Sequence, residues 1–127
     1  MKKSKNSLHI TSKRLLELRT ERKLSLSDVV SDLEKAGYNL NKSTISRYEN
    51  DQHEPTIQNL VILARYYAVS IDYLLGLSDN KKPTYSPDLI LKTPDGEPLA
   101  QSHSNSKLAA YYYRMYLKFR GDGNEKA

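Results

Sequence analysis

The side chains best suited to recognition chemistry lie in one octapeptide, residues 43–50, which reads Ser-Thr-Ile-Ser-Arg-Tyr-Glu-Asn. Ile45 and Tyr48 are three residues apart, which places both on one side of a helix. The small hydroxyl residues and Arg47 then face the other way. Arginine can donate two hydrogen bonds to guanine O6 and N7, whereas a serine hydroxyl discriminates weakly between bases. The octapeptide therefore predicts a short helix with one apolar face and one face suited to hydrogen bonding with nucleic acid.

Arrangements typical of enzymes and metal sites are missing from the sequence. The three histidines, His9, His53 and His103, lie far apart, and no pair has metal-ligand spacing. The chain has no cysteine, which excludes a disulfide and a thiolate metal site. It also has no glycine-rich phosphate-binding loop. We therefore expect a protein that is not an enzyme and has no cofactor or metal.

The charge balance is compatible with a polyanionic partner. Of 127 residues, 20 are Lys or Arg and 15 are Asp or Glu, a formal net charge of +5 at pH 7. This excess is modest, so charge alone does not distinguish a nucleic-acid ligand from a mildly basic surface. No apolar run approaches the ~20 residues of a membrane span, and the N-terminus lacks the apolar core of a signal peptide. We expect a cytoplasmic protein that does not bind membranes.

Two helices are predicted before the octapeptide. Leu15 and Leu18 are three residues apart and indicate a helix over 12–22. Ser25 followed by Asp28 has the spacing of a capping box, with Asp in place of Glu, and marks the start of a second helix. Gly37 favours the end of that helix, because glycine enters the left-handed conformation without strain.

Three further helices complete an all-α prediction. Asn41 or Ser43 caps the helix that contains the octapeptide, and residues 50–55 form a polar loop. Thr56 caps a fourth helix over 57–67, and a fifth over 71–75 closes the core. The residues of the fourth helix expected to face inward are Ile57, Leu60, Leu63, Ala64 and Tyr67.

The flanking segments have a different composition. Residues 1–11 are basic and polar, and we expect a flexible arm that could reach DNA. Residues 78–106 hold four of the five prolines and predict a linker or a small hairpin, with a turn at 93–96. We expect the core to be complete before residue 79, and residues 121–127 to be a polar tail.

A sixth, amphipathic helix is predicted over 107–120. Its apolar positions follow the spacing of one helical face, and Met and aromatic side chains suit a partner surface. Three interpretations stay open: the face joins two copies of the chain, folds back on the core, or binds a regulatory protein. The residues predicted to join two copies are Leu108, Tyr112, Met115, Tyr116 and Phe119.

The order and spacing of these motifs resemble the lambdoid phage repressors and Cro, a superfamily often called the XRE family. The matching stretches are Leu15–Arg19, Leu24-Ser25, Thr44–Asn50, Pro55-Thr56, Leu63-Ala64 and Val69–Leu75, spread over residues 12–77. The resemblance implies a five-helix, lambda-repressor-like domain that binds double-stranded DNA through a recognition helix. It also implies an ion pair between Arg19 and Glu49, which would fix the orientation of the recognition helix.

Two features depart from the family pattern. The second helix often begins with a glutamine that touches DNA, and here Leu26 stands there and can make only an apolar contact. Phosphate anchoring would then fall to Ser25, Ser27 and the first backbone amides of that helix. The connection from Gly37 to Thr44 is also longer than usual, so we expect Tyr38 and Asn39 to bulge outward.

The sequence thus predicts a DNA-binding transcriptional regulator, a repressor that binds a palindromic operator as a homodimer. The alternative is a protein-interaction module, an antitoxin-like or anti-repressor adaptor on the same fold, which Leu26 favours. Three origins stay open: a phage, a mobile element, or a bacterial immunity or toxin locus. The predicted DNA-binding residues are Ser25, Ser27, Asn41, Lys42, Ser43, Thr44, Ser46, Arg47, Asn50 and Gln52.

Overall fold

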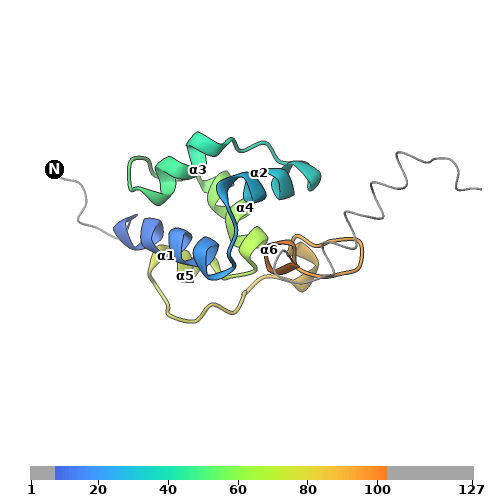
Figure 1. Cartoon of the computed structure of the whole chain (residues 1–127). Helices are drawn as coiled ribbons and strands as arrows, with labels where there is room; N and C mark the ends of the chain where they lie inside the picture. Colours follow the sequence, from blue (N-terminus) through green and yellow to red (C-terminus); the bar gives the residue numbers. More distant parts are fainter. Residues whose placement is uncertain (1–7, 103–127) are drawn as a thin grey trace, which may run out of the picture.

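Five α-helices follow one another in the part of the chain that the computed structural model describes, residues 8–102 (Figure 1). They are α1 (Leu8–Glu21), α2 (Leu26–Lys35), α3 (Lys42–Glu49), α4 (Ile57–Tyr67) and α5 (Ile71–Leu75). A 3-10 helix, η1 (Pro87–Leu89), and a short α6 (Leu99–Ser102) come after them. The only strand-like pairing among residues 8–102 is one isolated bridge between Lys92 and Pro98. The all-α prediction is confirmed.

The helix ends follow the local signals of the sequence. The Asp28 N–H donates to Ser25 Oγ at 3.0 Å and the Ser25 N–H donates to Asp28 Oδ2 at 2.9 Å, which completes the capping box. At the other end of α2, Gly37 has φ +94° and the Tyr38 N–H donates to the Leu33 carbonyl at 2.8 Å. The capping box and the glycine stop are therefore confirmed.

The next helix starts also agree with the sequence. Asn41, rather than Ser43, caps α3, and its Oδ1 accepts from the Thr44 N–H at 2.8 Å. Thr56 caps α4 by accepting from the Asn59 N–H at 3.1 Å. Helices α4 and α5 have the predicted bounds.

Two expectations about helix faces and ends were wrong. Helix α1 begins at Leu8, so residues 8–11 belong to the helix rather than to an arm, and Thr11 is buried. Ile57 is 82% exposed instead of facing inward. It shares a helix face with Leu60, but it is the first residue of α4 and its side chain stays exposed. Helical periodicity shows which residues share an apolar face, but it does not show which of them other parts of the chain cover.

The hydrophobic core draws side chains from all five helices. Each helix places its apolar positions toward the others, since an amphipathic helix is stable only when that face is covered. The members with almost no exposed surface include Leu18, Val29, Leu33, Ile45, Leu63, Ala64 and Leu74.

Residues 78–102 pack onto this core and extend it. Leu91, Leu99 and Ala100 are buried, and α6 contacts α4 and α2. The Tyr85 hydroxyl lies 2.9 Å from the Ala64 carbonyl and 2.8 Å from the Val69 carbonyl, so it donates at the C-terminal end of α4. The expectation that the core ends before residue 79 was therefore wrong. The segment is rich in Pro and polar residues, and the few apolar side chains that pack on the core do not form a recognisable pattern in its sequence.

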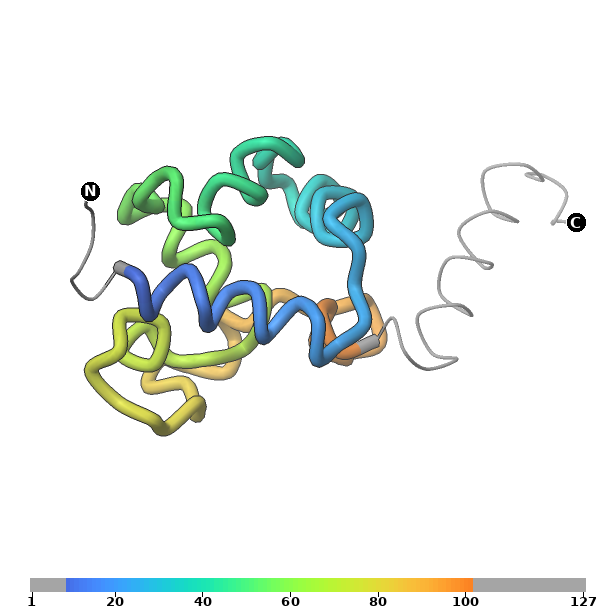
Figure 2. The backbone as a smooth tube through the Cα atoms, turned by 60° about the vertical axis from the view of Figure 1, so that its left-hand side comes forward, coloured from blue at the N-terminus to red at the C-terminus, as the bar shows by residue number. Residues whose placement is uncertain are grey.

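The turn expected at 93–96 is present within this segment. The Gly96 N–H donates to the Thr93 carbonyl at 2.9 Å, and Gly96 has φ +87°. In both ribbon and tube views, residues 78–102 lie on the side of the molecule away from α3 (Figures 1 and 2). The outer face of α3 is thus left uncovered by the added segment. Along residues 8–102, no helix combines the length and apolar character needed to cross a membrane.

A matched pair of leucines tests whether residues 78–102 belong to the folded unit. Leu91 is 7% exposed and Leu89 is 44% exposed in the same segment. We expect Leu91→Ala to lower the free energy of unfolding by about 2–5 kcal/mol, because it removes a buried side chain and leaves a cavity. Leu89→Ala should change it by roughly 0.5 kcal/mol or less. Urea unfolding measures both, and equal small effects would mean that the segment does not contribute to the core.

Candidate functional site

The outer side of α3 forms a shallow depression with the first residue of α2. Leu26, Asn41, Lys42, Ser43 and Ser46 line it, so the N-terminal ends of two helices meet there. Four of these five residues are polar. The depression is thus an open surface, lined by four polar residues and one leucine, at the beginning of the helix that contains the octapeptide.

The inner side of α3 is held by apolar packing. Ile45 and Tyr48 are buried in the core, as the octapeptide pattern predicts. Tyr48 also accepts a hydrogen bond from Asn59 Nδ2 of α4 at 2.8 Å, so its hydroxyl is not left without a partner. These contacts turn the opposite side of α3 outward.

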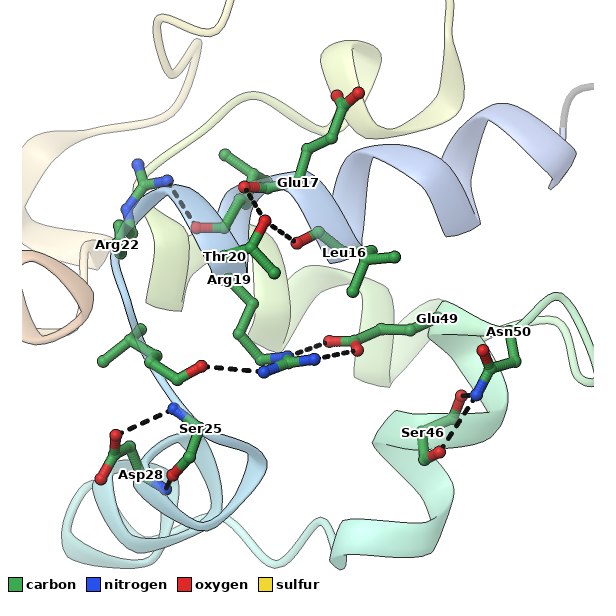
Figure 3. A network of polar contacts seen from close by, with 12 residues as sticks. Leu16, Glu17, Arg19, Thr20, Arg22, Ser25, Asp28, Ser46, Glu49 and Asn50 are labelled. Carbon is green, nitrogen blue, oxygen red and sulfur yellow. Dashed lines mark hydrogen bonds and ion pairs between the residues drawn. The ribbon is translucent and has the colours of Figure 1, made fainter.

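The C-terminal end of α3 is fixed by an ion pair with α1. Arg19 donates from Nε and Nη2 to the two carboxylate oxygens of Glu49, at 2.8 and 2.9 Å (Figure 3). Its Nη1 donates to the Leu24 carbonyl at 2.8 Å, in the turn before α2. The Glu49 side chain is only 4% exposed. Hydrogen bonding to Glu49 raises the pKa of Arg19, so the guanidinium stays charged and the pair persists at physiological pH.

The chain turns sharply after α3. Asp51 adopts a left-handed conformation with φ +60°, and the Gln52 N–H donates to the Arg47 carbonyl at 2.9 Å. The carboxylate of Asp51 accepts from Ser12 Oγ of α1 at 3.3 Å. This turn ends the helix and connects it to α1 a second time.

Several predicted site residues have side chains that are exposed to solvent. Ser27, Lys42, Arg47 and Gln52 are exposed. Across residues 8–102, no side-chain hydrogen bond or ion pair involves Lys42 or Arg47. The two cations of the octapeptide region are therefore available to a ligand.

Other predicted site residues make hydrogen bonds within the protein. Ser25 and Asn41 act as helix caps, and Ser43 Oγ donates to Asn41 Oδ1 at 3.2 Å. Asn50 Nδ2 donates to the Ser46 carbonyl at 2.9 Å and lies 3.2 Å from Ser46 Oγ (Figure 3). Thr44 is half-buried. These side chains position the surface as well as lining it.

The longer connection between α2 and α3 does not bulge outward at Tyr38. Tyr38 packs against the core, and its hydroxyl accepts from Arg65 Nη1 at 3.0 Å. Arg65 also donates through Nε to the Leu89 carbonyl, and its own carbonyl accepts from the Leu91 N–H at 3.2 Å. Arg65 thus joins the connection before α3 to residues 78–102. Sequence reasoning missed it, since no local pattern links residues so far apart.

Some predicted residues lie outside the described part of the chain. They are His103 and the residues predicted to join two copies of the chain, Leu108, Tyr112, Met115, Tyr116 and Phe119. Among residues 8–102, no three His, Cys, Asp or Glu side chains gather in a group able to hold a metal ion.

Comparison with known proteins finds one matching family model and two similar regulators. Residues 15–74 match the family model described as Helix-turn-helix. The uncharacterized HTH-type transcriptional regulator YobD of Bacillus subtilis (strain 168) is 43% identical over 70 residues, which cover 55% of this chain and 58% of that protein. The HTH-type transcriptional regulator ImmR of the same organism is 36% identical over 69 residues, covering 47% of this chain and 54% of that protein. The chain thus spans little more than half of these relatives, and no solved structure matches it significantly.

A double-mutant cycle tests whether Arg19 and Glu49 act as one unit. Either Arg19→Ala or Glu49→Ala leaves a charge of low exposure without its partner, so each should destabilise the domain. Replacing both should cost less than the sum, with a coupling of roughly 0.5–3 kcal/mol. Thermal or urea unfolding of the four proteins gives the coupling, and strictly additive losses would show that the pair is energetically independent.

Proposed function

We propose that this chain regulates transcription by binding duplex DNA through α3, since residues 15–74 match the helix-turn-helix family model. The observation that carries the proposal is the division of α3 into two sides. Its inner side and C-terminal end are fixed by the core and by Arg19, while Lys42 and Arg47 stay exposed with no internal partner. A rigid helix with free cations and hydroxyls on one side is suited to the major groove.

The proposed roles follow from the chemistry of each side chain. Arg47 reads a base edge, because a guanidinium can bond to guanine O6 and N7 at once. Lys42 mainly supplies positive charge to phosphate. Ser25 and Ser27 lie at the start of α2, where the first backbone amides and the helix dipole favour a phosphate. Asn50 and Gln52, at the other end of α3, are proposed to bind backbone oxygens.

The proposed regulator is a repressor that binds a palindromic operator as a dimer. Each recognition helix contacts only a few base pairs, so a specific site requires two half-sites and a two-fold partner. The proposed dimer interface is the predicted helix 107–120, which lies outside the described residues. Two joined domains bind far more tightly than one, because the second domain acts at a high effective concentration.

A second candidate function is an adaptor that binds protein instead of DNA. The observation that favours it is Leu26, a partly exposed leucine within the depression beside α3. An apolar residue there suits a protein partner as well as a base. The free side chains of Lys42 and Arg47 favour the DNA function.

Two substitutions in α3 separate base reading from phosphate binding. Arg47→Ala should cost about 1–3 kcal/mol on the best duplex from a randomised pool and relax preference at one position. Lys42→Ala should weaken specific and random duplexes alike and reduce the salt slope by about one unit. Fluorescence anisotropy over a salt series measures both effects. Equal losses on specific and random DNA for Arg47→Ala would exclude base reading.

The dimer proposal is tested by comparing the full chain with a chain that ends at residue 102. The shorter chain keeps Leu91, Leu99 and Ala100, so its core is intact. Sedimentation should show a dimer for the full chain and a monomer for the shorter one, with much weaker operator binding. If both the full and the shorter chain are dimers, the interface lies within residues 1–102. If both chains are monomers at micromolar concentration, the proposed homodimer is wrong.

A further inference from the structure

Leu26 is the apolar part of an otherwise polar recognition surface. It is the first residue of α2, packs on one side against the core, and stays partly exposed on the other. The capping box at Ser25 and Asp28 holds the backbone on either side of it. Its exposed methyl groups are therefore presented at a defined place in the depression beside α3.

The polar side chains around Leu26 offer donors from Asn41, Lys42 and Ser46, while Ser43 Oγ donates its proton to Asn41 and is left as an acceptor. Asn41 Oδ1 already accepts from the Thr44 N–H and from Ser43 Oγ. Ser46 Oγ lies within hydrogen-bond distance of Asn50 Nδ2. The Lys42 ammonium has three donors and no acceptor. A group that fits the depression should thus combine an apolar end with a hydrogen-bond acceptor.

In the major groove only thymine combines these two features. It presents a C5-methyl group next to the O4 acceptor, whereas cytosine presents an amino donor and no methyl group. Guanine presents two acceptors, and adenine presents an acceptor and a donor, both without a methyl group.

We propose that Leu26 determines specificity by contacting the C5-methyl group of a thymine while α3 lies in the major groove. This inference rests on the proposed function and adds the identity of one base to it. It also assigns a role to the position where the family often has glutamine. Loss of a single buried methyl group is worth ~0.8 kcal/mol, which corresponds to about a fourfold change in affinity.

The test replaces thymine by uracil in duplex DNA. A duplex is first selected from a randomised pool with the full chain, and each thymine is then replaced singly by deoxyuridine, which removes only the methyl group. We expect about fourfold weaker binding at one thymine in each half-site. Leu26→Ala should bind the thymine and uracil duplexes equally, and Leu26→Met should keep the preference because its side chain is apolar and of similar volume. The ratio of two affinities for one variant does not depend on how much of the protein is folded.

Leu77→Ala is the matched control, since Leu77 is 73% exposed and does not line the depression. It should keep the full preference for thymine. If specific binding persists and no thymine is sensitive, or Leu26→Ala keeps the same sensitivity, the role of Leu26 is wrong and the proposed function stands. If the folded full chain selects no duplex at all, the proposed function fails and the thymine contact fails with it.

Discussion

The contact between Arg19 and Glu49 is the constraint on which the placement of α3 and its outer surface depends. A carboxylate with almost no exposure is costly unless its oxygens are paired, and here both accept from one planar guanidinium. The third bond of Arg19, to the Leu24 carbonyl, extends this constraint to the turn before α2. One side chain of α1 therefore sets the positions of both helices whose N-terminal ends meet at the depression.

The rest of the structure keeps the inner side of α3 occupied and its outer side free. Asn59 holds Tyr48 from α4, and Ser12 contacts Asp51 from α1. Each of these bonds satisfies a group that would otherwise compete for a ligand or for water. Lys42 and Arg47 have no such partner among residues 8–102. A bound polyanion would thus meet free charges on a fixed backbone, with little conformational entropy lost in the helix itself.

Residues 78–102 add a layer that a five-helix plan alone does not include. They cover the side of the core away from α3, and Arg65 of α4 bonds both to this segment and to Tyr38 in the connection that leads to α3. The connection before α3 is therefore linked to the segment after α5 through Arg65, while the end of α3 is held from α1. This arrangement gives a physical route by which the segment after α5 influences the surface proposed to bind DNA.

Local signals in the sequence were sufficient for the ends of α2, α4 and α5, and only the tertiary structure decided which helix faces are covered. The capping box at Ser25, the glycine stop at Gly37 and the bounds of α4 and α5 depend on residues within about one turn of each other, so the sequence reveals them. The exposure of Ile57, the burial of Leu91 and the Arg65–Tyr38 contact depend on elements distant in the chain. Periodicity defines an apolar face but carries no information about what packs against it, and for that reason these features became visible only in the folded protein.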